Sequence, residues 1–280
     1  MSRSLSAAFG STIPPDDGTV TLQGRAYRPG TLLYQGKESR VYSACRTDGG
    51  DGDTAFVLKV YECTPGDDVW ETALRDAEAG RRLRGCRHIV PLLADTIRRS
   101  ASGTSDRCEV FLLMPKLLTF RERWDNLPSP PFHEREVTAL YRDIAAALQV
   151  IHRRGLVHGD VKPDNLYYDP RKGWLLGDFG SVIRRGEPAR TVSEGYCAPE
   201  ARAGQPCNPA TDAYALGVTV YRLVCGDRLP FCDRPCNQMT EDEVYHAIER
   251  RLRGEPIPPP TGISPALRRR IGKLLRQSWS

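Results

Sequence analysis

The sequence lacks several features that would place it in a specialised class of protein. Its 280 residues contain no apolar run near the about 20 residues that cross a bilayer, so we expect no membrane span. The start, MSRSLSAAFGSTIPPDDG, has no long apolar core, so we expect no secretory signal peptide. The net charge is only +5, without long blocks of one sign, which argues against a dedicated nucleic-acid binder.

The nine cysteines lack the close pairing that metal knuckles and disulfide frameworks show. Their number is odd and no Cys-x-x-Cys occurs. Scattered free thiols are typical of a reducing compartment, so we expect a cytoplasmic protein. The grouping of Cys207, Cys225, Cys232 and Cys236 leaves zinc binding open as an alternative.

The composition is that of a folded domain, with 40% hydrophobic and 27% charged residues. We interpret residues 1–22 as a flexible leader, because Ser, Pro, Gly and Asp dominate its first 18 residues. Short apolar runs predict strands over 30–36, 39–45, 55–61 and 109–117, and a helix over 69–85. Apolar residues at helical spacing predict helices over 133–155, 211–226, 240–254 and 264–277. The sequence therefore predicts an α+β fold with a small strand-rich lobe over 23–115 and a larger helical lobe over 116–280.

One stretch, LVHGDVKPDNLYYDPRKGWLLGDFG, concentrates polar residues within a hydrophobic frame. A short strand leads to Asp160. Two further strands, joined by a turn at 170–173, follow Asn165 and lead to Asp178. We expect these three side chains at one edge of the hairpin. An acid that accepts a hydroxyl proton, beside an Asn and an Asp that hold Mg²⁺ or Mn²⁺, suits phosphoryl transfer from ATP.

Three motifs in this order resemble the signature of the eukaryotic-type (Hanks-type) serine/threonine protein kinases. They are H-x-D-x-x-x-x-N over 158–165, D-F-G over 178–180 and A-P-E over 198–200. The resemblance implies a two-lobed protein-kinase-like fold, with ATP and Mg²⁺ at the lobe junction and a protein Ser or Thr as acceptor. It implies that Asp160 aligns the nucleophile, Lys162 steadies the transferring phosphate, and Asn165 and Asp178 hold the metal. The arginine-rich composition is typical of bacterial members.

The resemblance continues, with gaps, in the N-terminal lobe. Lys59 in mid-strand would clamp the ATP phosphates, although a lysine facing water from an edge strand is the alternative. The spacing back from Leu83 gives Asp76 as its acidic partner, with Glu78 and Glu71 as alternatives.

The nucleotide-covering pattern G-x-G-x-x-G-x-V aligns with residues 34–41, where Gly36 and Val41 match and two glycines are missing. Met114 would lie where the chain enters the hinge beside the adenine, or would be plain core.

Two further positions bear on regulation and stability. Gly159 stands where many related kinases carry an Arg that grips a phosphate on the activation segment. The resemblance therefore implies a kinase that is active without that phosphorylation. Ser193 stands where such kinases have a Thr that bridges the catalytic Asp and Lys, or is an ordinary loop serine. The C-terminal end is short for the family, so we expect Glu200 to lack its usual Arg unless Arg202, Arg268 or Arg276 substitutes.

Two other functions compete with a protein kinase. The pattern H-G-D-x-x-x-x-N also resembles small-molecule phosphotransferases of the aminoglycoside and choline kinase type. Lys162 and the A-P-E segment favour a protein substrate instead. A pseudokinase that serves as an ATP-binding or scaffold module is suggested by the missing glycines. The intact set of Lys59, Asp160, Asn165 and Asp178 argues against it.

Overall fold

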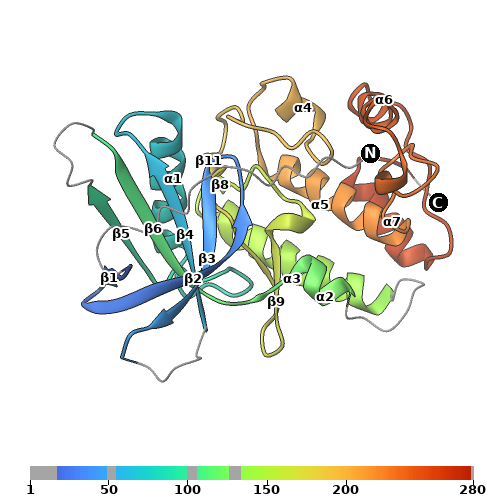
Figure 1. Ribbon diagram of the computed structural model, residues 1–280. Helices are drawn as coiled ribbons and strands as arrows, with labels where there is room; N and C mark the ends of the chain where they lie inside the picture. Colours follow the sequence, from blue (N-terminus) through green and yellow to red (C-terminus); the bar gives the residue numbers. More distant parts are fainter. Residues whose placement is uncertain (1–17, 49–54, 100–105, 126–133, 279–280) are drawn as a thin grey trace. The chain divides into compact units, whose positions relative to one another are not determined.

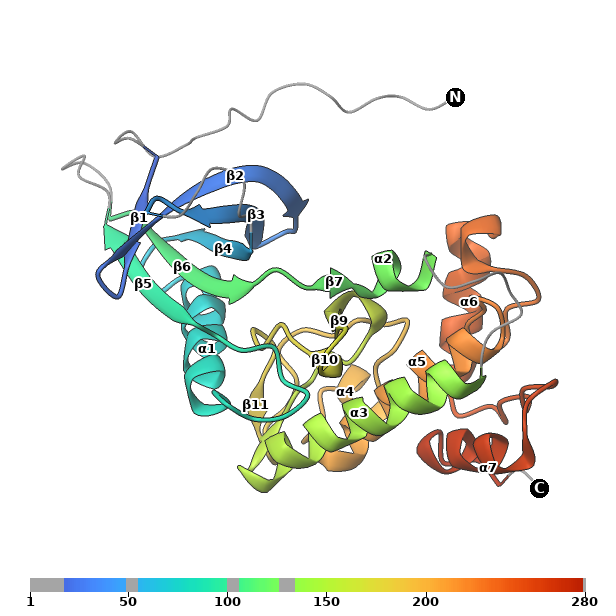
Figure 2. The same cartoon turned by 90° about the horizontal axis from the view of Figure 1, so that it is seen from below.

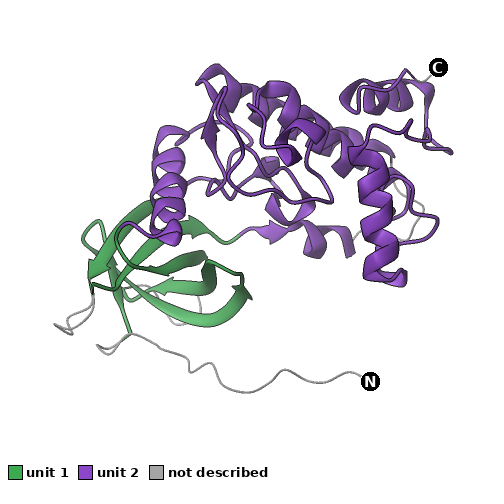
Figure 3. Ribbon diagram, turned by 90° about the horizontal axis from the view of Figure 1, so that it is seen from above, with its two compact units in different colours: residues 1–65, 93–116 green, residues 66–92, 117–280 purple. Residues whose placement is uncertain are grey.

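The computed structural model describes residues 18–48, 55–99, 106–125 and 134–278. The chain divides into two compact units, each described below by itself. Unit 1 comprises residues 1–65 and 93–116, and unit 2 comprises residues 66–92 and 117–280 (Figure 3). The helix that follows the third predicted strand is thus grouped with the C-terminal unit, whereas the sequence placed it in the N-terminal lobe.

Unit 1 is built on one antiparallel sheet (Figure 1). Its strand order is β1-β2-β3-β4-β6-β5, and β1 and β5 approach each other within 8 Å between Cα atoms, so the sheet curls towards closure. Apolar side chains of β4 and β6, including Leu58, Phe111 and Leu113, pack in the core of this unit. The strands are β1 (Val20–Leu22), β2 (Arg25–Gln35), β3 (Ser39–Arg46), β4 (Phe56–Cys63), β5 (Ala94–Arg99) and β6 (Cys108–Pro115).

Two strands of unit 1 escape the sequence prediction. Val20–Leu22, which the sequence placed in the leader, pairs with β2 and buries Val20 and Leu22 in the core. The expectation of a leader to residue 22 is therefore wrong for these residues, and residues 1–17 lie outside the described part. Strand β5 lies at the edge of the sheet, and its two apolar residues, Ala94 and Ile97, are three positions apart and so lie on opposite faces. The sequence of this strand therefore shows no apolar alternation.

Unit 2 is mainly helical, and its two longest helices pack against each other (Figure 2). The buried residues of α3 recur at helical spacing from Val137 to Ile151, and α5 is buried along nearly its whole length. The helices are α1 (Asp68–Arg82), α2 (Phe120–Asp125), α3 (Glu134–Arg153), α4 (Pro199–Arg202), α5 (Pro209–Val224), α6 (Glu241–Leu252) and α7 (Pro265–Leu274). Two 3₁₀ turns are η1 (Pro163–Asn165) and η2 (Cys236–Gln238).

Short strands of unit 2 carry the segment that the sequence singled out. They are β7 (Leu118–Thr119), β8 (Leu156–Val157), β9 (Leu166–Asp169), β10 (Gly173–Leu176) and β11 (Ile183–Arg184). Strand β9 pairs with β10 and β7, and β8 pairs with β11. The predicted hairpin of β9 and β10 is therefore confirmed, and its turn contains Gly173 at φ +82°.

Helix α5 begins two residues earlier than the sequence indicated. Its N-cap is Asn208, with a capping box that involves the Thr211 hydroxyl. The sequence predicted that this helix begins at Thr211. Thr211 is instead the third helical residue, and Asp212 is freed for another role in the site.

Candidate active site

The hairpin brings the catalytic-loop motif and the D-F-G motif together within unit 2. Leu166 of β9 pairs with Leu176 of β10, and Gly177 N donates to Asn165 O at 3.0 Å. Residues 158–165 and 177–180 therefore lie side by side at the ends of the two strands. The expectation that the hairpin would gather these motifs at one edge is met.

Asp160 lies at the centre of a dense set of polar contacts. Its Oδ2 accepts from Lys162 Nζ at 2.8 Å and from Asn165 Nδ2 at 3.0 Å. The same amide nitrogen donates to Asp160 O at 2.7 Å. The other oxygen, Oδ1, is buried and has no hydrogen-bond partner among the described residues. A buried carboxylate oxygen without a partner costs free energy, so its retention points to a group that the site receives.

His158 organises this loop from beneath and is fully buried. Its Nδ1 accepts from Asp160 N at 3.3 Å, so Nε2 carries the proton and donates to Gly177 O at 3.2 Å. The imidazole ring also packs edge-on against Phe179, with 5.6 Å between centroids. One neutral histidine thus connects the catalytic loop to the D-F-G motif.

Asp212 is a site residue that the sequence reasoning missed. Its carboxylate, 1% exposed, accepts His158 N at 2.8 Å and Gly159 N at 2.9 Å. His152 Nε2 contacts the same carboxylate at 2.7 Å. Asp212 therefore holds the backbone immediately before Asp160. A signal was present in the sequence, because an acid inside an otherwise apolar helix is costly unless it has such partners.

Two features of position 159 favour glycine: the backbone conformation and the lack of room for a side chain. Its φ is +81°, and a Cβ added there would lie 2.8 Å from Ser181 O. Any side chain would be strained and would press on the segment after the D-F-G motif.

Lys162 connects Asp160 to the activation segment. Its Nζ donates to Ser193 Oγ at 2.9 Å, which is the lysine half of the bridge predicted for Ser193. Burial opposes its charge, but attraction by Asp160, Asp164 and Asp178 outweighs burial and raises the pKa of Lys162. The lysine therefore stays cationic at neutral pH beside the unpartnered Asp160 oxygen.

Helix α1 distinguishes among the three candidate acids. Asp76 is buried, and its Oδ1 accepts from Phe179 N at 3.1 Å. Glu78 is exposed and lies 3.8 Å from Arg82, one turn away, and Glu71 is exposed in the first turn. Glu78 and Glu71 lie on the exposed side of α1, because the helical period turns both away from the buried face of Ala73, Asp76 and Gly80. The pairing of Asp76 with Lys59 stays a prediction.

Lys59 occupies an interior position of the unit 1 sheet. It lies on β4 between β3 and β6, opposite Val41 and Leu112, and only 7% of it is exposed. The alternative of a water-facing edge lysine is therefore wrong. Its Nζ lies 5.0 Å from the centroid of the Tyr61 ring, a cation–π contact. Met114, on the neighbouring strand, is half-buried opposite Val57.

The loop between β2 and β3 is a tight turn. Gly36 N donates to Ser39 O at 2.9 Å, and Tyr34 pairs with Val41 across the hairpin. A Cβ on Gly36 would meet the Tyr34 ring at 3.0 Å, a tight contact with a side chain that has room to shift. Tyr34 itself is 61% exposed.

The end of the activation segment is held by two arginines that lie far away in the sequence. Arg251, 1% exposed on α6, donates to Cys197 O at 2.7 Å and to Glu194 O at 2.5 Å. Arg276, just after α7, binds Glu200 through both nitrogens, at 2.6 and 3.0 Å. The sequence named three possible substitutes for the usual partner of Glu200, and of these Arg276 fills the role.

We predict that Glu200→Gln destabilises the chain by about 1–3 kcal/mol, less than a fully buried pair because Arg276 is 46% exposed. Burial opposes ionisation of Glu200, but its bonds to Arg276 and Thr211 outweigh burial and lower its pKa from 4.5. This stabilisation is therefore present above about pH 4.5 and is lost as the pH falls through the lower, folded-state pKa. Denaturant unfolding at pH 7 and pH 4 measures both effects.

The matched control is Glu255→Gln, because Glu255 also bonds an arginine, Arg250, with both side chains exposed. We expect this variant to unfold almost as the unchanged chain does. Equal losses in the two variants would show that the Arg276 contact has no special importance.

The residues present fit a divalent cation with oxygen ligands. The Asn165 amide nitrogen bonds Asp160 O and Asp160 Oδ2, and the amide oxygen, which takes no part in these bonds, is the atom that would bind a metal. Asp178, at φ +60°, directly precedes the buried Phe179. Carboxylate and amide oxygens suit Mg²⁺ or Mn²⁺. A group of three or more His, Cys, Asp or Glu placed for a metal does not occur among the described residues.

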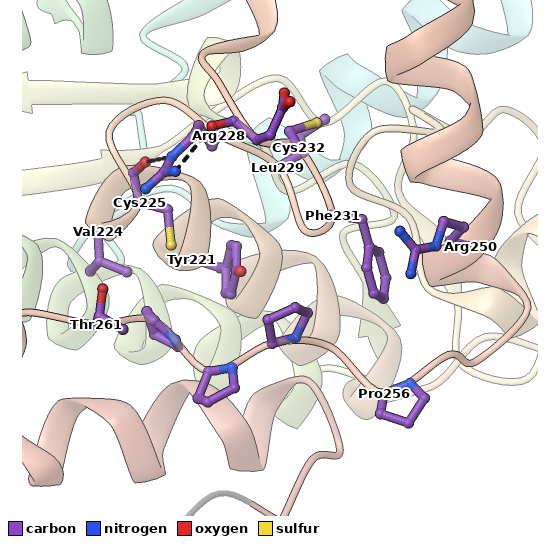
Figure 4. Close-up of a pocket in the computed structure, with 14 residues that line it drawn as sticks. Tyr221, Val224, Cys225, Arg228, Leu229, Phe231, Cys232, Arg250, Pro256 and Thr261 are labelled. Carbon is purple, nitrogen blue, oxygen red and sulfur yellow. Dashed lines mark hydrogen bonds between the residues drawn. The ribbon is translucent and has the colours of Figure 1, made fainter.

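The cysteine alternative for zinc is therefore not supported. Cys207 is buried in a cluster with Val157 and Ile183, whereas Cys225 and Cys232 line a cavity of about 460 Å³ (Figure 4). The arginines of this cavity already have partners, Arg228 at Cys225 O and Arg250 at Glu255. The cavity contains none of the catalytic-loop residues, so we do not assign it to the chemistry.

Comparison with known proteins agrees with this arrangement. The sequence profile described as "Protein kinase domain" matches residues 27–280. The chain belongs to the protein kinase family, as the three motifs predicted.

Among curated relatives, the SNF1-related protein kinase catalytic subunit alpha KIN12 of Arabidopsis thaliana is 30% identical over 160 residues, which is 52% of this chain and 31% of that protein. Calcium/calmodulin-dependent protein kinase type IV of Homo sapiens is 32% identical over 134 residues, 45% of this chain and 28% of that protein. The matches thus span about a third of these relatives' length.

A solved structure has a similar fold. The kinase PK-1 of the Cydia pomonella granulovirus matches with a TM-score of 0.67 and 18% identity, over 90% of this chain and 88% of that chain. The expected α+β kinase-like fold is thereby confirmed. Within the described residues, no helix is long and apolar enough to cross a membrane.

Proposed function

We propose that this chain transfers the γ-phosphate of ATP to a serine or threonine hydroxyl of a protein. The observation that carries the proposal is the buried Asp160 Oδ1, which has no partner among the described residues while Oδ2 is held by Lys162 and Asn165. An acceptor hydroxyl placed at Oδ1 would donate its proton there. Its oxygen would then be oriented for in-line attack.

The other residues take roles that their surroundings support. Lys162, held cationic, would neutralise charge on the phosphoryl group as it transfers. Asn165 and Asp178 would hold Mg²⁺ or Mn²⁺, which when bound neutralises the charge of the phosphates. We assign Lys59, Gly36, Val41 and Met114 of unit 1 to ATP binding. The cytoplasmic location and a bacterial source stay predictions.

A polypeptide acceptor is favoured over a small molecule by the architecture after the D-F-G motif. Ser193 bonds Lys162, and Arg251 and Arg276 fix the segment from Glu194 to Glu200. These contacts build a surface beside Asp160 that an aminoglycoside or choline acceptor would not need. These contacts therefore favour a protein as the acceptor of the phosphate.

The test is incubation of the purified chain with radiolabelled ATP and Mg²⁺, with casein, myelin basic protein, kanamycin or choline as acceptor. We expect label on serine or threonine of a protein, and none with Lys59→Met. Label on kanamycin or choline alone would favour the small-molecule alternative. Stabilisation by Mg·ATP without any transfer, including autophosphorylation, would favour a pseudokinase.

The metal assignment makes a separate prediction. Asp178→Asn is expected to weaken ATP binding by about tenfold or more in Mg²⁺, with little change in EDTA, because it removes one charged oxygen ligand. Calorimetry in Mg²⁺ and in EDTA measures the ATP affinity of this variant with and without the metal. Asp125→Asn, an exposed acid on α2, serves as control. Equal weakening of ATP binding with and without metal would contradict the role of Asp178.

A further inference from the structure

Two cysteines of unit 1 contact each other through their thiols. Cys63 ends β4 and Cys108 begins β6, and the two residues are direct partners across the antiparallel ladder. Their Sγ atoms lie 3.7 Å apart. Each thiol also points to the partner's carbonyl, at 3.7 Å for Cys63 Sγ and 3.4 Å for Cys108 Sγ. Strand pairing thus holds two thiols face to face.

This placement suits a covalent bond. Directly opposed residues of antiparallel strands have Cα atoms about 4.5–5.5 Å apart, within the about 4.4–6.8 Å that disulfides span. The sulfurs have to close from 3.7 Å to about 2.05 Å, which side-chain rotation supplies without a change in strand register. We propose that Cys63 and Cys108 are an oxidisable dithiol, which hydrogen peroxide converts into an intrachain disulfide.

Hydrogen peroxide is the only oxidant that this reaction needs. One cysteine, as its thiolate, attacks a peroxide oxygen and becomes a sulfenic acid, and the O–O bond breaks to release hydroxide. The second thiol loses its proton and attacks the sulfenic sulfur, which forms the S–S bond and expels the sulfenic oxygen as water. Overall, two thiols and one H₂O₂ give one disulfide and two H₂O, and the sulfurs are oxidised as the peroxide is reduced.

The position of the pair gives a route for the oxidant. Both thiols are buried, at 6% and 3% exposure, but they lie at the ends of their strands. The residues next in the chain, Thr64 and Pro65 on one side and Asp106 and Arg107 on the other, are exposed. Opening of the terminal pair therefore exposes the sulfurs without disruption of the sheet, as is usual for strand ends. A small oxidant such as peroxide needs no more than that.

A second pair of neighbouring cysteines has to be distinguished from Cys63 and Cys108 in the experiment. In unit 2, burial and the nearby Cys236 thiol raise the pKa of Cys232, so these two thiols are also neighbours, but they lie outside paired strands and Cys236 begins η2. Cys63 and Cys108 differ because paired strands fix both backbones. The two pairs share no residue, so oxidation of each can be followed independently.

Oxidation is expected to raise the stability of the chain. The bond would close a loop from residue 63 to residue 108, which contains α1 and β5. A cross-link over a loop of this length restricts the unfolded chain considerably. We therefore expect the melting temperature to rise by about 5 °C or more on oxidation and to return on reduction.

The experiment uses the full chain, reduced and then exposed to a small excess of hydrogen peroxide. Free thiols are blocked with N-ethylmaleimide before tryptic digestion without reductant. We expect the peptide of residues 60–75, whose one cysteine is Cys63, linked to the peptide of residues 108–116, whose one cysteine is Cys108. The linked peptide should lack two hydrogens relative to its parts and should separate in dithiothreitol.

Cysteine variants then show which cysteine pair causes the rise in melting temperature. Cys63→Ser and Cys108→Ser should each remove the peroxide-induced rise, and the double variant Cys232→Ser/Cys236→Ser should keep it. Because a serine in the buried position can impair folding, Cys63→Ala is a second test, and the peptide mapping needs no variant at all. The proposal is overturned if peroxide leaves both peptides fully alkylated, converts them only to sulfinic acids, or links Cys232 to Cys236 alone.

Discussion

Replacement of Asp160 by alanine is expected to lower the rate of phosphate transfer by about 1000-fold or more while the chain stays folded. The carboxylate is the group that would orient the acceptor hydroxyl, and orientation accounts for much of the acceleration in this reaction. In the described part of the chain, this carboxylate bonds Lys162 and the Asn165 amide, and the amide keeps a second bond to the Asp160 backbone. We therefore expect a large fall in the rate of phosphate transfer and only a small fall in the free energy of unfolding.

The measurement is the initial rate at saturating ATP, together with ATP affinity and the far-ultraviolet circular dichroism spectrum. We expect only the rate to collapse. The control is Asp169→Ala, an acid on the adjacent β9 whose side chain accepts a hydrogen bond from the backbone N–H of the turn residue Arg171. A variant at Asp160 that works at the rate of the unchanged chain would exclude it as the group that orients the hydroxyl.

The second large effect is expected from Asp212→Ala. This change removes a buried acceptor from the backbone nitrogens of His158 and Gly159 and from the His152 ring. Two buried N–H groups are then left without this partner, which costs about 1–3 kcal/mol each. We expect a total loss of about 3–5 kcal/mol in unfolding free energy and a disordered catalytic loop with little activity.

Guanidinium unfolding of Asp212→Ala, Asp212→Asn and His152→Ala separates the contributions. The asparagine variant keeps one acceptor oxygen, so we expect it to lose less stability than the alanine variant. The histidine variant keeps both backbone bonds and should lose the least. If His152→Ala were as destabilised as Asp212→Ala, the backbone bonds would not be what Asp212 contributes.

The sequence predicted the site where the relevant residues are close in the chain. Asp160, Asn165 and Asp178 are separated by two short strands and a turn, and such a hairpin has few ways to fold. Lys59 was predicted because a lone inward lysine in mid-strand is costly unless it meets an anion. Of the three acids on α1, the helical period could have separated Asp76 from Glu78 and Glu71, but the direction of the buried face was not known.

The residues that escaped prediction act over long distances in the sequence. Asp212, Arg251 and Arg276 contact main-chain or carboxylate groups 53 to 76 positions away. Nothing in the local pattern shows which carbonyl a buried arginine will meet. Strand β5 was missed because its two apolar residues, Ala94 and Ile97, do not alternate with polar ones along one face. These long-range contacts and the edge strand depend on which residues pack together in the fold, and not on the local preference of the sequence for helix or strand.

Gly159 has a consequence for anyone who wishes to place this chain under the control of another kinase. The obvious design is to insert the arginine that grips a phosphate on the activation segment. Its Cβ alone would stand 2.8 Å from Ser181 O on a backbone at φ +81°. The arginine therefore cannot be introduced first: the turn at Ser181 has to be rebuilt before position 159 accepts it. The order of the two changes is fixed, and a library that varies position 159 alone should return only glycine among its active members.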